Sequence, residues 1–420
     1  MVFESFADAQ STWLWAGFAI AFILGALVNK TNFCTMGAVS DFVNMGDTGR
    51  LRSWVFAMAV AIIGVAALEF AGIIDLGSTF PFYRGGNLAW GENIIGGLLF
   101  GIGMTLASGC GNKCLVRIGG GNIKSIVVFA IIAVIAYFML NPFPGSDKTL
   151  YSVLFVDWAR PLSADLGATQ DLGGLLGGEE PATVRLVVGM VVGVLLLLYV
   201  FRSAEFRSSS DNILGGLVVG LAVLAAWYVT STTVIDADGE ITTLSGYYEQ
   251  WDMLAESDEG KPAAGRPLST QSFTFINPIG QSYGYASSGF DSALLTFALV
   301  SVFGVALGSF VWSILSKSFR VEWFSSASDV FNHVIGAVLM GFGGTLAMGC
   351  TIGQGVTGVS TLAVGSILTF FAIFYGSALT MKVQYYKMCY EEEATFFKSL
   401  ITGMVDLKLL PESLRKLEAI

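Results

Sequence analysis

Residues 94–110 read IIGGLLFGIGMTLASGC, and residues 334–350 read VIGAVLMGFGGTLAMGC. The two stretches agree at ten of 17 positions at a constant offset of 240 residues, and both end in Thr-Leu-Ala-x-Gly-Cys. Each is an apolar run close to the length of a bilayer-spanning helix. Small residues let helices pack closely in lipid, but packing alone does not require the same ending twice. The pair therefore predicts an internal repeat.

Glycine-rich, weakly hydrophobic segments follow both copies. They read GNKCLVRIGGGNIKS at 111–125 and TIGQGVTGVSTLAVGS at 351–366, and another apolar run comes after each. Irregular backbone at membrane depth is tolerated only where protein surrounds it or where it lines a water-filled cavity. The sequence therefore predicts a broken, re-entrant element after each copy.

The composition indicates a membrane protein. The 420 residues are 54% hydrophobic and 13% charged, with a mean hydropathy of +0.68, and a soluble surface needs far more charge. We expect an all-α polytopic membrane protein with nine transmembrane helices and short re-entrant helices. Each expected span approaches the ~20 residues that a bilayer requires, and they lie at 12–29, 53–74, 92–109, 123–141, 184–201, 211–230, 291–316, 332–349 and 366–385.

The distribution of charge orients these spans. The segments 142–183 and 232–290 hold six and eight acidic residues against two basic residues each, whereas 16 of the 22 Lys and Arg residues fall on the opposite side. Cytoplasmic connections carry the excess of Lys and Arg. We therefore expect a bacterial inner-membrane protein with its N-terminus outside, two acidic outer segments and a cytoplasmic tail at 386–420.

This orientation makes the two copies of the repeat inverted. The span that ends at Cys110 runs inward, and the span that ends at Cys350 runs outward. Inverted repeats with broken helices are typical of transporters, whose sites lie near the midplane between the repeats. The chain is thus expected to be a single transport domain, 1–420, with inverted halves at approximately 12–141 and 211–385.

Three of the five cysteines stand where apolar helices break. Cys110 and Cys350 end the two repeat copies, and Cys34 lies in NKTNFCTMGAVSD at 29–41, just after the first span. A thiol is a polarisable, weak hydrogen-bond donor, so it can contact a soft anion without holding it tightly, as a conducting path requires. A single buried cysteine is more often an inert small residue, but three at three breaks predict a substrate pathway.

Other residues near these breaks are candidate auxiliaries of the pathway. Cys114 forms a CxxxC spacing with Cys110 and has Gln354 at its equivalent position in the second copy. Lys113 and Arg117 either attract an anion or extend to the inner headgroups, and Lys124 has the same two interpretations. The remaining candidates are polar residues at or beside the breaks: Asn32, Thr105 and Thr345. Cys389 lies beyond the last span and is treated as incidental.

Several function classes are disfavoured. The single histidine, His333, argues against histidine-rich metal sites and a Ser-His-Asp triad. The sequence has no nucleotide-binding loop or metal-ligand spacing and no basic stripe typical of nucleic-acid binding. We therefore expect no catalytic residues, no metal, no cofactor and no nucleic-acid partner; the expected surroundings are the lipid bilayer.

The motifs NFCTMGAVSD at 32–41, TLASGCGNKCLVRIGGGNIKS at 105–125 and TLAMGCTIGQGVTG at 345–358 resemble those of the YeeE/YedE family of bacterial sulfur transport proteins, the YedE branch in particular. The resemblance covers nearly all of the membrane portion. It implies a non-enzymatic thiosulfate-uptake fold whose central cysteines, here Cys34, Cys110 and Cys350, relay thiosulfate by weak S–H contacts. It also implies a cytoplasmic TusA-like sulfurtransferase as a candidate partner.

Alternatives stay open on the sequence alone. The long outer segments and Cys114 depart from the family pattern, so a selenium compound is an alternative substrate. A membrane thiol oxidoreductase using Cys110 and Cys114, or a channel for a neutral solute, would also fit a polytopic chain with thiols. The aromatic stretch 267–289 would suit a partly inserted hairpin or lid, although a covered outer loop is the favoured interpretation.

Overall fold

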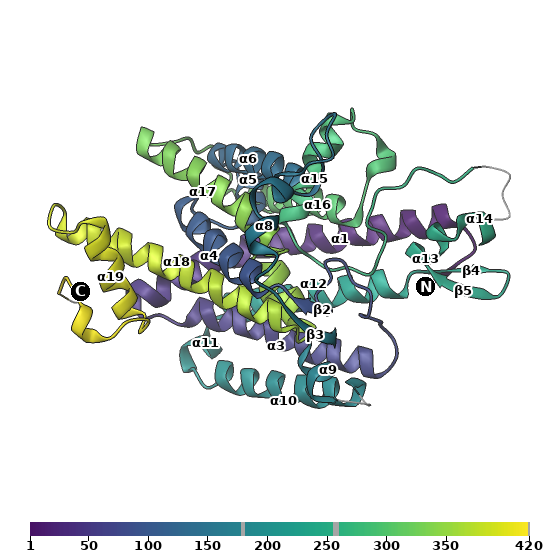
Figure 1. Cartoon of the computed structure of the whole chain (residues 1–420), viewed down its shortest axis with the longest axis horizontal. Helices are drawn as coiled ribbons and strands as arrows, with labels where there is room; N and C mark the ends of the chain where they lie inside the picture. The colour runs from purple at the N-terminus through teal and green to yellow at the C-terminus, as the bar shows by residue number, and fades with distance from the viewer. Residues whose placement is uncertain (178–180, 255–259, 419–420) are drawn as a thin grey trace.

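A computed structural model describes residues 1–177, 181–254 and 260–418 (Figure 1). Nine helices of 17 residues or more coincide with the nine expected spans. They are α1 (Phe6–Thr31), α3 (Gly49–Phe70), α4 (Trp90–Leu106), α6 (Ile123–Leu140), α10 (Pro181–Phe201), α12 (Ser210–Thr232), α16 (Phe297–Leu315), α17 (Ala327–Leu346) and α18 (Val364–Tyr390). The all-α polytopic fold class is confirmed.

Eight helical segments of the described chain are long and apolar enough to cross a membrane. The helix outside this set is α17, whose first turns carry Asp329, Asn332 and His333 and so lower its hydropathy. The two termini lie at opposite ends of the long axis in Figure 1. A chain that crosses a membrane an odd number of times has its termini on opposite sides. We therefore count α17 as the ninth membrane-crossing helix.

Shorter elements join and cap the long helices. At membrane depth they are α2 (Thr35–Ser40), the π-helical η1 (Asp41–Met45), α5 (Gly111–Gly119) and the π-helical η3 (Gly353–Gly358). The connections carry α7 (Leu150–Leu154), α8 (Val156–Ala159), α9 (Leu172–Gly177), α11 (Ala204–Ser208), α13 (Leu244–Glu249), α14 (Trp251–Leu254), α15 (Ile276–Ser287) and η2 (Ser292–Leu294). Beyond α18 lie α19 (Phe396–Asp406) and η4 (Glu412–Leu414), so the expected tail from 386 begins as the last turn of a long helix.

Two small sheets lie on the connections. Strands β1 (Val2–Phe3), β4 (Val234–Ala237) and β5 (Glu240–Thr243) form one sheet, in which β1 pairs in parallel with β4 and β4 pairs antiparallel with β5. Strands β2 (Gly85–Leu88) and β3 (Ala164–Thr169) form an antiparallel pair. The first sheet ties the N-terminus to the segment 232–290, and the second ties the segment 142–183 to the loop before α4.

The two repeat helices, α4 and α17, pack through glycines with two-fold symmetry. A Cβ on Gly96 would lie 2.8 Å from the carbonyl oxygen of Gly343, and a Cβ on Gly336 would lie 2.6 Å from that of Gly103. Because Gly96 and Gly336, like Gly103 and Gly343, are separated by the repeat offset of 240, each contact is the counterpart of the other. Such reciprocal pairing is the mark of a two-fold interface, and only glycine permits so close a backbone approach.

The stretch 267–289 is inserted among the helices, and the interpretation as a covered outer loop was wrong. Phe273 and Phe275 are fully buried, and α15 packs between α6 and α16. Ile276 packs against Gly111, which follows the break after α4, and against Gly344, which precedes the break after α17. Aromatic and β-branched side chains at 273–276 gain more from burial than they would on a solvated loop, which explains the insertion.

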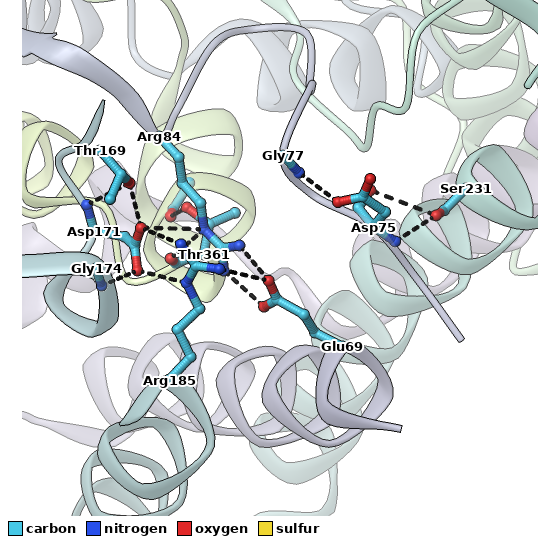
Figure 2. Close-up of polar contacts among 11 residues, drawn as sticks. Glu69, Asp75, Gly77, Arg84, Thr169, Asp171, Gly174, Arg185, Ser231 and Thr361 are labelled. Atoms are coloured by element: carbon cyan, nitrogen blue, oxygen red, sulfur yellow. Dashed lines mark hydrogen bonds and ion pairs between the residues drawn. The ribbon is translucent and has the colours of Figure 1, made fainter. Parts of the chain in front are cut away.

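Four charged side chains form a partly buried network at one end of the bundle (Figure 2), with Arg84 and Asp171 as its buried members. Arg84 donates to both carboxylate oxygens of Glu69, at 2.5 and 2.8 Å, and Arg185 binds Asp171 through two nitrogens at 2.8 and 2.9 Å. Arg84 also donates to the backbone oxygen of Thr361 at 3.1 Å. The sequence left Glu69 unexplained; here it joins α3 and α10 to the loop that follows η3.

Acidification is expected to weaken this network. Burial raises the pKa of Asp171, but hydrogen bonds from Arg185 and Thr169 and the charge of Arg84 outweigh it and lower the pKa to about 2. An unfolded aspartate has a pKa near ~3.9. The stabilisation is therefore fully present above pH ~4 and is lost as the pH falls towards about 2, an effect of about 2 kcal/mol.

The thermal unfolding midpoint in detergent, followed from pH 7 to 2, measures this loss. Asp171→Asn should lower the stability at pH 7 by about 3 kcal/mol, because it removes the two-nitrogen contact to Arg185 and leaves that residue only Glu69, at 3.4 Å, as a charged partner. The midpoint of the variant should then fall less steeply than that of the wild type between pH 4 and 2. Parallel pH profiles for the two proteins would contradict the assignment.

Candidate functional site

The three helix breaks anticipated from the sequence share one backbone geometry. Each long helix ends in a residue with positive φ, and a pathway cysteine follows two positions later. The positive-φ residues are Asn32 (51°), Ser108 (59°) and Met348 (55°), ahead of Cys34, Cys110 and Cys350. Non-glycine residues with positive φ are uncommon and signal a site that the surrounding structure enforces.

Each cysteine stands at the N-cap position before the next helical segment, and Cys34 and Cys350 make a capping hydrogen bond there. Cys34 and Cys350 accept from the backbone N–H three residues ahead, of Gly37 and Gly353, both at 3.4 Å. For Cys110 the corresponding N–H, that of Lys113, also faces the sulfur. Serine, threonine or aspartate would normally take this capping role. With the sulfur lone pair directed at the helix N–H, the thiol hydrogen stays available as a donor.

The three cysteines converge although more than 300 residues separate the first from the last. A charge on the Cys110 sulfur would be felt by both Cys34 and Cys350. All three are buried free thiols, with side chains at most 6% exposed. The structure thus brings together the residues expected to line the pathway, whereas Cys389 is exposed and stands apart.

The inserted stretch contributes a wall that the sequence did not predict. The Thr274 side chain and the backbone of Phe275 lie against the Cys350 sulfur. A Cβ on Gly353 would lie 2.3 Å from the Thr274 hydroxyl oxygen, which shows how closely η3 approaches this stretch. Residues from three distant parts of the chain therefore surround Cys350.

Among the auxiliary candidates, Asn32 and Lys113 are joined. The Lys113 ammonium donates to the Asn32 side-chain oxygen at 2.6 Å, so it bridges the first and second breaks. Arg117 lies in the last turn of α5, where a cation complements the helix dipole. Lys124 forms an ion pair with Asp329 at 2.8 Å. Of these cations, Lys113 comes nearest to the cysteine cluster, within the electrostatic reach of Cys34 and Cys110.

The other auxiliary candidates are engaged in helix packing. Thr345 donates to the carbonyl of Gly341 within its own helix, and the Thr105 hydroxyl bonds to Ser377 on α18. Gln354 donates to the Ala347 oxygen at 2.6 Å and so closes the third break. Cys114 donates to the Ser125 oxygen on α6 at 2.9 Å.

Several polar residues at the centre were missed by the sequence reasoning. The hydroxyls of Thr35, Thr351, Thr274 and Tyr83 are buried, and within the described residues they have no hydrogen-bond partner. A signal was available for two of them, because Cys-Thr occurs at both 34–35 and 350–351. For Thr274 and Tyr83, only the tertiary structure shows the proximity to Cys350.

A cavity of about 10 Å³ lies next to the third break, at Cys350. Its walls include Tyr83, Met348 and Gln354, together with Asn93, Gln170 and Ser366. This space is about that of one water molecule. The segment 142–183 therefore reaches the third break through Gln170.

Comparison with known proteins identifies the family. The sequence model of the Sulphur transport family matches residues 30–379, which hold all three cysteines. The thiosulfate transporter TsuA of Escherichia coli (strain K12) is 25% identical over 348 residues, covering 81% of this chain and 86% of the relative. The thiosulfate transporter TsuA of Spirochaeta thermophila is 23% identical over 376 residues, covering 86% and 96%. These matches bear out the resemblance drawn from the motifs: the chain belongs to the Sulphur transport family.

Proposed function

We propose that this protein is a permease for thiosulfate, with a central pathway lined by the thiols of Cys34, Cys110 and Cys350. The relatives named thiosulfate transporters support the substrate. The observation that carries the proposal is the convergence of three cysteines, each two positions after a positive-φ break and ahead of a short helical segment. As a member of a transport family, the protein moves its substrate and is not an enzyme.

The chemistry of the thiols suits a soft anion. The sulfurs of Cys34 and Cys350 accept a backbone N–H, so their S–H groups can point towards the terminal sulfur of thiosulfate. Such S–H contacts are weak. Three weak sites in succession allow an anion to bind and leave, whereas a fixed positive charge at the centre would hold it.

Direction and location follow from the charges. We propose that the protein lies in the bacterial inner membrane with its N-terminus outside, because the basic residues gather on the connections at the C-terminal end. The halves 12–141 and 211–385 would then be inverted, with Lys113 towards the cytoplasm and Met348 towards the outside. A TusA-like sulfurtransferase is the proposed cytoplasmic acceptor of the imported sulfur.

The test is uptake of radiolabelled thiosulfate into proteoliposomes that hold the purified full-length chain. Saturable uptake, competed by unlabelled thiosulfate but not by equal sulfate, is the expected result. Selenite and sulfite are the further competitors, since stronger competition by a selenium compound would favour that substrate. Uptake no faster than in empty liposomes would contradict the proposal.

A further inference from the structure

We propose that three buried threonines, Thr35, Thr351 and Thr274, bind the oxygen atoms of the transported anion while the thiols bind its terminal sulfur. The substrate class would then be a tetrahedral oxyanion that carries one soft terminal atom. This assignment rests on the proposed function, since it concerns the same pathway. It adds a second recognition element, hydroxyl donors, to the cysteines.

The first argument is placement, because one threonine accompanies each cysteine. Thr35 follows Cys34 in the chain. The Thr351 side chain lies beside Cys110, and the Thr274 side chain lies beside Cys350. The three hydroxyls come from the first break, the third break and the inserted stretch, so tertiary packing explains why Thr351 and Thr274 are paired with thiols.

The second argument is that these hydroxyls lack a strong hydrogen-bond partner. Thr351, Thr35 and Thr274 are 0%, 4% and 7% exposed, and among the described residues none of the three makes a hydrogen bond of ordinary geometry. The groups that Thr351 and Thr274 face are the thiols of Cys110 and Cys350, and sulfur is a weak acceptor. Buried polar atoms are rarely left unpaired. In lipid-embedded protein the penalty is larger still, because bulk water is absent. A ligand that accepts hydrogen bonds would remove it.

Threonines in the long helices that precede two of the breaks show why Thr35 and Thr351 differ. Thr345 and Thr105 lie inside helices and donate to the carbonyl four residues back, on Gly341 and Gly101. Thr35 and Thr351 occupy the first position of their helices, next to the capping cysteine. The carbonyl four residues back therefore lies before the break, out of the helix, and the hydroxyl cannot turn back to it.

The ligand chemistry follows from the two kinds of donor. A threonine hydroxyl donates well to a charged oxygen, whereas a thiol is a weak donor suited to a soft acceptor. Thiosulfate offers both, as three sulfonate oxygens and one terminal sulfur. An anion that carries only oxygens or only a soft sulfur would bind the hydroxyls or the thiols but not both. The arrangement therefore favours an anion that carries both kinds of acceptor atom.

The experiment measures the KM and maximal rate of thiosulfate uptake in proteoliposomes for Thr351→Val, Thr274→Val, and the matching Thr351→Ser and Thr274→Ser. Valine keeps the shape and removes the donor. A hydrogen bond to a charged group contributes enough to raise KM roughly tenfold to a hundredfold when it is lost. Serine keeps the donor, so its KM should stay within about threefold of the wild type, a smaller change than loss of such a bond produces.

Thr380→Val is the matched control, because its hydroxyl is already bonded to the Gly376 oxygen within α18, and it should leave KM unchanged. Unfolding midpoints in detergent show that each variant is folded. Wild-type KM in both pathway valine variants, or serine variants as impaired as the valine ones, would overturn the hydroxyl assignment alone. If the wild type fails to take up thiosulfate, the proposed function itself falls.

Discussion

Cys110→Ala is expected to abolish measurable thiosulfate uptake, with at least a hundredfold loss of rate. Cys110 is the middle thiol of the three, since both Cys34 and Cys350 lie within its electrostatic reach. Removing one donor to a charged ligand reduces binding by roughly tenfold to a hundredfold. Loss of the Cys110 contact also interrupts the succession of weak binding sites. The rate of thiosulfate uptake should therefore fall by about a hundredfold or more. Uptake by proteoliposomes at matched protein content measures it.

Two other cysteines provide the controls. Cys389→Ala should transport like the wild type because Cys389 is exposed beyond the pathway. Cys114→Ala should retain most uptake because the Cys114 thiol is bonded to the Ser125 oxygen on α6. Normal uptake by Cys110→Ala would contradict the proposal that thiols line the pathway. Strong loss in Cys114→Ala, together with a redox-sensitive crosslink to Cys110, would instead favour the thiol oxidoreductase.

Gly103→Ala and Gly343→Ala are expected to destabilise the protein by about 3 kcal/mol each, and by equal amounts. A Cβ on Gly103 would lie 2.5 Å from the Gly336 oxygen, and one on Gly343 would lie 2.6 Å from the Gly96 oxygen. Backbone cannot rotate away as a side chain can, so α4 and α17 must separate. Alanine favours a helix over glycine by only ~1 kcal/mol, which the overpacking exceeds.

The unfolding midpoint in detergent, with the yield of folded protein, measures this effect. Gly260→Ala is the control, since a Cβ there meets nothing within 4 Å, and it should leave the midpoint unchanged. A large decrease in the unfolding midpoint of one variant and none in the other would contradict the two-fold contact. A decrease in both midpoints with an unchanged KM for thiosulfate would show that these glycines act in helix packing and not in the pathway.

Much of the fold was predictable because lipid imposes simple rules on a chain. A bilayer requires about 20 apolar residues per helix, so the nine spans could be read from hydropathy. Their ends were less accurate: α1 begins at Phe6 and α18 runs to Tyr390, beyond the predicted 12 and 385. A helix can continue beyond the bilayer through polar residues, and hydropathy does not detect these polar turns.

The outer segment 232–290 shows where local sequence reasoning fails. Its polar and acidic residues indicated an outer loop, yet Phe273 and Phe275 are fully buried and Thr274 reaches Cys350. Whether a mixed segment lies on a surface or enters the bundle depends on the space between distant helices. The ion network of Glu69 with Arg84 is similar, because neither residue's partner lies close in the chain.

The repeat and its cysteines were legible in the chain, since the same 17-residue pattern at an offset of 240 implies the same local backbone twice. The sequence thus established a membrane fold with paired breaks and named Cys110 and Cys350. What the tertiary structure decided is proximity: the convergence of Cys34 with them, the arrival of Thr274, and the joining of Lys113 to Asn32. The reason is physical, because periodicity and composition act along the chain, whereas these contacts depend on how closely glycine-bearing helices pack across it.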